Sequence, residues 1–490
     1  MTNRFISTAI PYVNAAPHIG FALELVITDV LARYARRRGA DVYFLSGTDE
    51  NSLKNALAAA AAGERVHDFV ARHAAEYAAL RTTLDLSYDD FLRTSADPRH
   101  APAVTKLWEA CTRNGDIYAG DYTGLYCVGC EQFLAADELV DGLCVEHRTP
   151  PEHVSERNYF FRLSRYRDAL VALHERGAIA IRPTRRRNEV LAFLQQPLGD
   201  LSISRSVERA HGWGLPVPGD ASQIVYVWFD ALANYISALG YAHGGAPFEH
   251  YWTHAERISH VIGKGVIRFH AVYWPALLLS AGVPVPSELL VHGYVTVEGR
   301  KIGKSLGNAV APRDACAVHG TDALRYYLLR HVGSQRDGDF SWSRFDEVYA
   351  HDLANDLGNL VTRVTALGRR YGVPPGGAAA SELADGLGAK VHAHLEEFAL
   401  DRALDEIWAV IGAANAYVNR TAPWQLAKQA RSAELRAALS ELYAVLRVLG
   451  SVLEPFLPAS ARRLSAALDT SAAVQLFPRE RSAPCVAATP

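Results

Sequence analysis

The first 45 residues carry the pattern that most restricts the fold of this chain. Residues 4–11 contain a short apolar run of strand type, residues 21–37 repeat apolar side chains at three- and four-residue intervals, and residues 41–45 are again strand-like. Two strands joined by a crossover helix lie parallel in one sheet, and the connection is right-handed. This segment therefore predicts the start of a doubly wound parallel α/β sheet of the Rossmann type.

Later segments interrupt this alternation and then resume it. Residues 116–220 contain a cysteine cluster, several Tyr and Phe residues and a basic, proline-containing tract, and we interpret them as an inserted α+β domain. Strand patterns return at residues 224–229, 260–262 and 289–294, each followed by helical sequence. We expect these three segments to continue the parallel sheet.

The C-terminal part of the chain has a different pattern. From about Trp342 onward strand signals vanish, and apolar side chains between Leu400 and Tyr417 keep the spacing of a helix. This predicts an all-α helical bundle. We expect a loop at residues 374–377 and a loose tail at residues 482–490.

These patterns predict six segments, since a chain of 490 residues exceeds the usual size of a single core. They are a first half of a Rossmann domain at 1–115, an inserted domain at 116–220, a second half of the Rossmann domain at 221–295, a lysine-containing loop region at 296–345, an α-helical domain at 346–475 and a loose tail at 476–490.

Composition narrows the class of protein. Hydrophobic content of 49% and charged content of 21% are those of a soluble globular enzyme. The sequence has no apolar run of roughly 18 residues and no basic-then-apolar leader, so we expect a cytoplasmic protein without membrane contact. A net charge of -3 gives no overall attraction to nucleic acid. Any RNA contact would come from local patches such as Arg36–Arg38 and Arg185–Arg187.

Two short motifs, far apart in the chain, predict a nucleotide site. Pro17–Gly20 lies in the connection between a predicted strand and the helix that follows it. Amides at the N-terminus of a helix favour anions. Gly20 would let the backbone approach a nucleotide, and His18 would donate to a phosphate oxygen. Lys301 and Lys304 lie on a glycine-flanked loop, where flexible ammonium groups could follow the charge that develops on a leaving pyrophosphate. A solvated capping histidine and a solvated basic loop are the structural alternatives, but the two motifs together indicate ATP-driven activation of a carboxylate.

A cluster of cysteines in the inserted segment predicts a metal. Cys127 and Cys130 form one pair with two residues between them, and Cys144 and His147 form a second. Such pairs present three sulfurs and one imidazole to a tetrahedral ion, which is typical of structural zinc. Four unrelated buried residues are the alternative. With no open coordination position, the ion would hold the insertion together and do no chemistry.

Further segments accompany the two nucleotide motifs. They are Ala9–Asn14, Gly47–Glu50, Gly199–Arg205, Tyr226–Ala231 and Ile262–Lys264. Together with His18–Phe21 and Lys301–Ser305, these segments resemble the signatures of class I aminoacyl-tRNA synthetases, and in particular of methionyl-tRNA synthetases with a single zinc knuckle. The resemblance extends from about residue 4 to residue 470.

The resemblance implies a complete reaction. Methionine and ATP, with Mg²⁺, would form methionyl-adenylate, and the methionyl group would pass to the 3′ end of initiator and elongator methionine tRNA. The enzyme would be a monomer with one structural zinc that helps to orient the acceptor end of the tRNA. His18 and the two lysines would be catalytic, and the ATP site would comprise His18, Gly20, Phe21, Lys301, Lys304 and Ser305.

The resemblance also assigns the two recognition sites. An unbranched thioether side chain needs aromatic and aliphatic walls, one polar contact, and an acid for the substrate ammonium. The matching residues are Ile10, Tyr12, Asp49, Trp228, Ala231, Leu232, Tyr235, Val266 and His270, with Asp49 as the acid and His270 as the polar contact. The anticodon would be read by Asn359 and Arg363, four apart on one helix, and by Trp424 on another, since unpaired bases are bound by stacking and by hydrogen bonds to their edges.

Four departures from the family pattern leave alternatives open. Phe21 replaces a usual His, Asn51-Ser52 replaces His-Gly, Gly265 replaces Asp, and Ile302-Gly303 replaces Met-Ser. One alternative is a paralogue that adenylates methionine or a related amino acid for resistance or for small-molecule amide synthesis. The other is a catalytically weak tRNA-binding protein.

Overall fold

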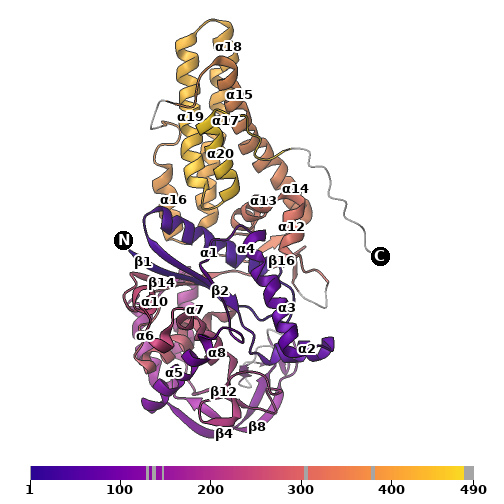
Figure 1. Ribbon diagram of the computed structural model, residues 1–490, viewed down its shortest axis with the longest axis vertical. Helices are drawn as coiled ribbons and strands as arrows, with labels where there is room; N and C mark the ends of the chain where they lie inside the picture. The colour runs from indigo at the N-terminus through magenta and orange to yellow at the C-terminus, as the bar shows by residue number, and fades with distance from the viewer. Residues whose placement is uncertain are drawn as a thin grey trace. The chain divides into compact units, whose positions relative to one another are not determined.

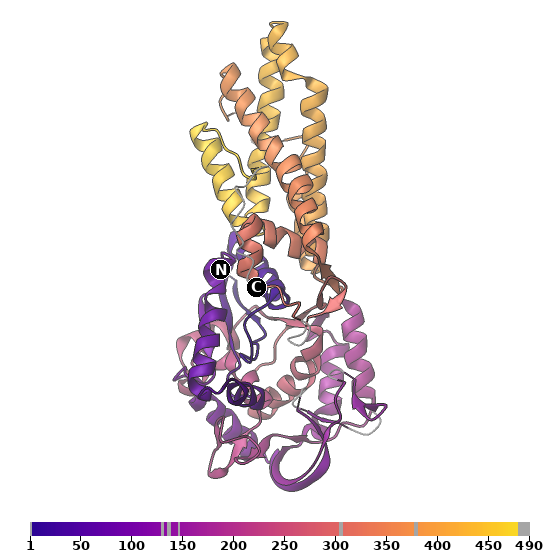
Figure 2. The same cartoon turned by 90° about the vertical axis from the view of Figure 1, so that its right-hand side faces the viewer.

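The structure is a computed structural model that describes residues 2–128, 132–134, 139–145, 148–302, 307–376 and 381–478. The chain folds into two compact units (Figures 1 and 2). The first unit contains Met1–Pro17, Arg38–Ala79 and Tyr88–Val291, and the second contains His18–Arg37, Leu80–Ser87 and His292–Pro490.

A six-stranded sheet organises the first unit. Its order is β3-β2-β1-β14-β15-β9, with bounds β1 (Asn3–Thr8), β2 (Asp41–Thr48), β3 (Asp90–Arg93), β9 (Ala180–Arg182), β14 (Arg257–Gly263) and β15 (Glu288–His292). β1 pairs in parallel with both β2 and β14, β2 with β3, and β15 with β9. Helix α1 (Ile19–Arg37) connects β1 to β2 along the chain. The predicted parallel sheet is therefore confirmed, with its first strand at the centre.

Apolar side chains of these strands form one core with the helices of the first unit. Phe5 of β1 and Leu289 of β15 are fully buried in this core, together with Trp108 and Trp274. β15 is buried along its whole length, as is typical of a parallel strand covered on both faces. The helices are α2 (Leu53–Ala62), α3 (Val66–Ala78), α5 (His100–Arg113), α6 (Arg167–Glu175), α7 (Thr184–Gln195), α8 (Val227–Leu232), α9 (Asn234–Ser237), α10 (Ala246–Phe248) and α11 (Trp274–Ala281).

The insertion contains antiparallel strands. A four-stranded sheet has the order β10-β8-β4-β5, and its long central pair runs in register from Ile117↔Phe161 to Tyr126↔Glu152. The strands of this sheet are β4 (Ile117–Cys127), β5 (Gln132–Leu134), β8 (Glu152–Phe161) and β10 (Leu201–Ser202). Strands β6 (Leu139–Val140) and β7 (Leu143–Cys144) pair separately with each other. Strand β9 also lies between residues 116 and 220, but it pairs with β15 in the main sheet.

One predicted strand is wrong in extent and in its sheet. Residues 224–229 were expected to continue the parallel sheet, but β13 (Asp220–Val225) joins β11 (Ser204–Ser206) and β12 (Pro216–Val217) in a separate antiparallel sheet. The chain then enters α8 at Val227. A short apolar run does not distinguish a strand from a buried helix, and this run contains the end of one and the start of the other. The other two strands are confirmed as β14 and β15.

Helices dominate the second unit, as the sequence predicts. They are α1, α4 (Leu80–Thr83), α12 (Pro312–His319), α13 (Thr321–Tyr326), α14 (Trp342–Val348), α15 (Asn359–Tyr371), α16 (Leu387–Glu396), α17 (Leu400–Thr421), α18 (Pro423–Lys428), α19 (Ser432–Leu453) and α20 (Pro458–Thr470). Figure 2 shows the long helices of this unit running side by side. A small sheet has the order β17-β16-β18, with bounds β16 (Val295–Val297), β17 (Arg300–Lys301) and β18 (Gly338–Phe340).

Two other expectations concern loops and membranes. Residues 374–376 lie between α15 and α16 outside any helix, as predicted. The loose tail predicted at 476–490 is wrong at its start, because Leu476 and Phe477 are buried, and residues 479–490 lie outside the described residues. Over the ranges that the structure describes, we find no helix both long enough and apolar enough to cross a lipid bilayer.

Candidate functional site

His18 lies immediately before the first turn of α1, in the second unit. The Gly20 N–H donates to His18 Nδ1 at 3.1 Å, and the N–H groups of Phe21 and Ala22 donate to the His18 carbonyl at 3.0 and 3.2 Å. Because Nδ1 accepts a hydrogen bond, the proton of the neutral ring is on Nε2. Burial lowers the pKa of His18, which favours this neutral form. The ring is therefore prepared to donate from Nε2 beside a helix N-terminus that attracts anions.

Gly20 is required by the position of the histidine ring. A Cβ at residue 20 would lie 2.8 Å from His18 Cε1 and 2.9 Å from His18 Nδ1, which is closer than real Cβ atoms approach other heavy atoms. The N–H of Ile19, between these two residues, donates to the Val310 carbonyl at 3.0 Å. The sequence predicted Gly20 for close approach to a nucleotide, and the structure adds close approach to His18.

The predicted lysine loop is only partly described. Lys301 ends β17 and is exposed, and its carbonyl accepts from Asn308 Nδ2 at 3.1 Å. The turn before β17 is anchored to β18, since the Gly299 N–H donates to Asp339 Oδ1 at 2.8 Å. Lys304 and Ser305 lie outside the described residues.

The predicted methionine pocket lies within the first unit, and the structure brings several of its aromatic residues together. The rings of Tyr12 and Trp228 meet edge to face with centroids 6.4 Å apart, and Trp228 stacks on Phe269 at 3.5 Å. Among the described residues, no acceptor lies within hydrogen-bonding reach of Trp228 Nε1. This buried donor therefore remains for a ligand or water. Phe269 was not predicted from the sequence.

Asp49 lies beside Tyr12. The two residues form an isolated parallel bridge, and the Asp49 N–H donates to the Pro11 carbonyl at 2.9 Å. Asp49 is only 2% exposed, so its carboxylate is largely removed from water. Ile10 lies near as well, because its Cγ2 would be 3.2 Å from a Cβ at Gly47. A buried carboxylate on a residue that is bridged to Tyr12 suits a substrate ammonium group.

Tyr235 of α9 forms a hydrogen-bonded pair with His270. His270 Nδ1 lies 2.9 Å from the Val266 carbonyl and donates to it, so Nε2 accepts from the Tyr235 hydroxyl at 2.7 Å. Burial lowers the pKa of His270 to about 4, so the ring is neutral at physiological pH. The remaining predicted wall residues, Ala231 and Leu232, are also buried.

A second buried histidine supports this pair and was missed by sequence reasoning. The His260 ring lies 4.1 Å from the Tyr235 ring, and its Nδ1 is 2.7 Å from Ser7 Oγ of the neighbouring strand β1. Burial lowers the pKa of His260 well below its ordinary value. An isolated His in a strand pattern carries no signal that could have identified this contact.

Both residues of the departure at Asn51-Ser52 have structural roles here. Asn51 Nδ2 donates to Asp230 Oδ2 at 2.8 Å, and His100 Nε2 donates to the other oxygen of Asp230 at 2.6 Å. All three residues are buried. Ser52 caps α2, since its hydroxyl accepts from the Asn55 N–H at 3.2 Å. The loop that carries Asp49 is thus tied to α8 and to the start of α2.

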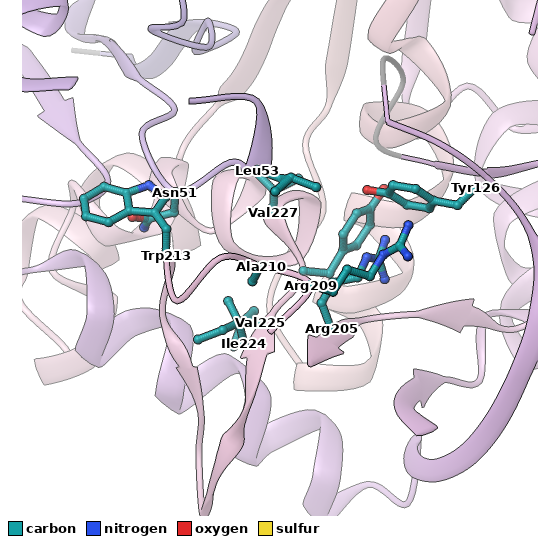
Figure 3. A pocket seen from close by; sticks show the side chains of 11 residues that line it. Asn51, Leu53, Tyr126, Arg205, Arg209, Ala210, Trp213, Ile224, Val225 and Val227 are labelled. Atoms are coloured by element: carbon teal, nitrogen blue, oxygen red, sulfur yellow. The ribbon is translucent and has the colours of Figure 1, made fainter. Parts of the chain in front are cut away.

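A small pocket lies beside this loop (Figure 3). Its volume is about 30 Å³, enough for a water molecule but not for an amino acid. The Arg205 guanidinium lies over the Tyr126 and Tyr226 rings at 4.9 and 4.5 Å, and the Arg209 guanidinium lies 4.5 Å from the Tyr126 ring. Asn51 also lines the pocket. Arg205 ends one of the recognised segments, but no sequence pattern indicated these ring contacts.

The predicted zinc ligands are only half described. Cys127 ends β4 and is 1% exposed, and Cys144 ends β7 and is 2% exposed. Cys130 and His147 lie outside the described residues. Within the described ranges alone, no group of three or more His, Cys, Asp or Glu side chains could hold a metal ion. The zinc knuckle stays a prediction, although two buried thiols at strand ends fit its donor set.

The predicted anticodon residues lie on two helices of the second unit. Asn359 begins α15 and Arg363 lies one turn further along. The Arg363 guanidinium is 5.9 Å from the Trp424 ring, and its Nη2 donates to Asn419 Oδ1 at 3.0 Å. Trp424 is 39% exposed, so one face of a large aromatic side chain remains open to solvent. The structure therefore brings Arg363 and Trp424 together as predicted, and it adds Asn419.

The two arginine patches make contacts within the protein. Arg36 Nη1 donates to Ser87 Oγ at 2.9 Å, and Arg37 Nη2 donates to Ser451 Oγ at 2.6 Å. Arg186 pairs with Glu189 at 2.8 Å, and Arg187 Nε donates to the His174 carbonyl at 3.1 Å. These contacts give the patches structural roles that composition alone could not reveal.

Comparison with known families identifies the chain. The family model described as tRNA synthetases class I (M) matches residues 4–150 and 135–365. The model of the anticodon binding domain of methionyl tRNA ligase matches residues 373–486. The chain belongs to the methionyl-tRNA ligase family. Methionyl-tRNA ligases are aminoacyl-tRNA ligases, so the protein is an enzyme of that class.

Individual relatives cover nearly all of the chain. The methionine–tRNA ligase of Thermotoga maritima is 41% identical over 458 residues, which are 91% of this chain and 72% of the relative. The methionine–tRNA ligase of Brucella suis biovar 1 is 40% identical over 473 residues, 94% of this chain and 90% of the relative.

Solved structures of methionyl-tRNA ligases share the fold. The Mycobacterium tuberculosis methionyl-tRNA synthetase in complex with methionyl-adenylate has a TM-score of 0.90 and 38% identity, over 98% of this chain and all of that chain. The apo form of the same enzyme has a TM-score of 0.83 and 35% identity, with 99% of each chain covered.

Proposed function

We propose that the protein activates L-methionine with ATP and Mg²⁺ and transfers it to methionine tRNA. A methionine carboxylate oxygen attacks the α-phosphorus, the bond to the bridging oxygen breaks, and pyrophosphate leaves. A hydroxyl of the terminal ribose of the tRNA then attacks the carbonyl of the adenylate, and AMP leaves. The observation that carries this proposal is about 40% identity to methionine–tRNA ligases over more than nine-tenths of the chain.

Residues of the first unit would select the amino acid. Asp49 would pair with the substrate ammonium, while Tyr12 and Trp228 would enclose the thioether side chain. The hydrogen bonds of His270 to Tyr235 and to the Val266 carbonyl keep both its ring nitrogens occupied. A substrate side chain with a charge would meet neutral groups there, and burying that charge unpaired would be costly. This favours an uncharged, weakly polar side chain such as that of methionine.

Residues of the second unit would act on the triphosphate. His18 would donate from Nε2 to a phosphate oxygen, and Gly20 keeps its ring in place. Lys301, Lys304 and Ser305 would follow the charge onto the leaving pyrophosphate. Mg²⁺ would enter with ATP and neutralise the same charge.

Amino-acid-dependent ATP–pyrophosphate exchange tests the whole proposal. We expect exchange with methionine and with no other proteinogenic amino acid, followed by charging of methionine tRNA. Exchange with a different amino acid would favour the paralogue alternative, and RNA binding without exchange would favour a tRNA-binding protein. The match to methionine–tRNA ligases along nearly the whole chain does not favour either alternative.

Anticodon recognition should be separable from activation. Replacing Trp424 with alanine removes the exposed stacking surface beside Arg363, and a base–aromatic stack is worth about 1–3 kcal/mol. We expect kcat/KM for charging of methionine tRNA to fall about 10- to 100-fold, with unchanged ATP–pyrophosphate exchange. Leu57→Ala, at an exposed apolar residue of the first unit, is the control and should leave both activities unchanged. Equal losses of exchange and charging in Trp424→Ala would contradict an anticodon role.

We also propose that Cys127, Cys130, Cys144 and His147 hold one structural zinc ion. Four protein ligands leave no open position, so the ion would stabilise the insertion and take no part in bond breaking.

Elemental analysis checks the zinc proposal. The purified protein should contain about one zinc per chain, and Cys144→Ser should lose it because a hydroxyl is a much weaker ligand than a thiolate. Cys111→Ser is the control, since Cys111 lies on α5 outside the proposed ligand set, and it should keep its zinc. A Cys144→Ser protein with a full complement of zinc would refute the ligand assignment.

A further inference from the structure

An open groove lies along the C-terminal half of α15 in the second unit. Its volume is about 670 Å³. One side is formed by α15 and the other by a short segment of chain that follows α20. The lining residues are Thr362, Thr365, Ala366, Arg369, Arg370, Ala473, Val474 and Gln475.

The groove is positively charged. Arg369 and Arg370 are both exposed, and none of the lining residues is acidic. Within the part of the chain that the structure describes, neither guanidinium pairs with a carboxylate. The Arg370 guanidinium lies 5.5 Å from the Tyr371 ring. Other arginines of this unit do pair with a carboxylate, as Arg325 does with Asp29 at 2.8 Å.

The far side of the groove is held in place. Thr362 Oγ1 donates to the Val474 carbonyl at 3.2 Å, and Arg463 Nη1 donates to the Leu476 carbonyl at 3.1 Å. The next residue, Phe477, is buried against Tyr349 with ring centroids 6.1 Å apart. The groove therefore has two fixed walls, with both arginines on the α15 side.

The groove adjoins the proposed anticodon residues. Arg370 lies seven residues after Arg363, so the two share one face of α15 about 10.5 Å apart along its axis. Thr362, beside Arg363 in the chain, lines the groove itself. An RNA loop whose bases lie against Arg363 and Trp424 would have its sugar–phosphate backbone within reach of these charges.

We propose that this groove binds the phosphate backbone of the tRNA strand next to the anticodon. Arg369 and Arg370 would neutralise phosphates without reading bases, because phosphate contacts position a nucleic acid and carry no sequence information. This inference rests on the proposed function, since it requires that tRNA is the partner of the second unit. It adds a binding surface that supplies affinity where the anticodon residues supply selectivity.

The salt dependence of tRNA binding tests the proposal. The logarithm of the binding constant falls linearly with the logarithm of the salt concentration. Each neutralised phosphate adds about 0.7 to the magnitude of this slope for a single strand and about 0.9 for a duplex. Arg369→Gln/Arg370→Gln should therefore reduce this slope by about 1–2 for full-length protein and methionine tRNA. Affinity should fall to a similar extent for methionine tRNA and for a variant with a changed anticodon, while methionine-dependent ATP–pyrophosphate exchange stays at the wild-type level.

Controls separate this inference from the proposed function. Arg402→Gln changes an exposed arginine at the start of α17, outside the groove, and should leave the slope unchanged. A wild-type slope in the double variant would overturn the groove proposal, and so would a selective loss of anticodon discrimination. If the wild-type protein neither activates methionine nor charges tRNA, the proposed function itself fails. The single variants Arg369→Gln and Arg370→Gln apply the same test if the double variant does not fold.

Discussion

Replacing His18 with alanine should lower kcat for methionine-dependent ATP–pyrophosphate exchange about 10²- to 10³-fold. Removal of one positioned donor to a developing anion typically has an effect of this size. The donor is available because the Gly20 N–H occupies Nδ1 and leaves the proton on Nε2. Gly20→Ala should lower the rate in the same direction, since the new Cβ would lie 2.8 Å from His18 Cε1 and displace the ring. Steady-state exchange kinetics with saturating methionine and ATP measure both effects.

The control for this prediction is the same substitution at a solvated histidine. His67 lies on α3 with its side chain 69% exposed, and His67→Ala should exchange at the wild-type rate. Thermal unfolding should show that His18→Ala remains folded. Exchange by His18→Ala within about threefold of wild type would remove His18 from the catalytic residues.

Replacing Arg325 with methionine should destabilise the second unit by about 3–5 kcal/mol, as is typical when one partner of a buried ion pair is removed. Arg325 and Asp29 are both fully buried, with Nη2 2.8 Å from Asp29 Oδ2. The same guanidinium donates to the carbonyls of Leu84, Pro455 and Phe456 at 3.0, 2.8 and 2.8 Å. Methionine fills similar volume but leaves three buried carbonyl groups without a donor. The midpoint of thermal unfolding should fall by about 6–20 °C.

Arg402→Met is the matched control, because Arg402 is an exposed arginine of the same unit. It should shift the midpoint by less than about 2 °C, as is usual for surface substitutions. An unchanged midpoint for Arg325→Met would mean that the buried ion pair contributes no net stability. Both variants would be compared at one pH and salt concentration, since buried and exposed charges respond differently to screening.

Local patterns predicted the elements whose apolar spacing is visible within one continuous run of residues. The periodicity of residues 21–37 became α1, and the apolar runs near residues 260 and 290 became β14 and β15. The prediction for residues 224–229 was wrong, because a run of apolar residues does not record which sheet a strand joins. Strand β9 was not predicted, because it has only three residues and lies in a basic tract. Three residues are too few to show the alternation of apolar and polar side chains that marks a strand.

In the candidate site too, local sequence identified some residues and missed others. Motif spacing identified His18 and Gly20, whose hydrogen bond links residues two apart. Phe269 and His260 were missed, since each acts through a partner distant in sequence: Trp228 for one, and Ser7 for the other. The departure at Asn51 suggested an altered site, but its amide donates to Asp230, 179 residues away. Such a compensating contact has no local signal.

The sequence by itself indicated the methionyl-tRNA ligase family, a parallel α/β sheet and a helical C-terminal part. Motifs and periodicities are properties of neighbouring residues, so they can be recognised without coordinates. Only the tertiary structure decided which buried polar groups meet, which ring nitrogen of His18 carries the proton, and where arginines remain exposed beside α15. Those outcomes depend on contacts between distant residues, and the free energy of each contact is set by burial and hydrogen-bond geometry rather than by residue type.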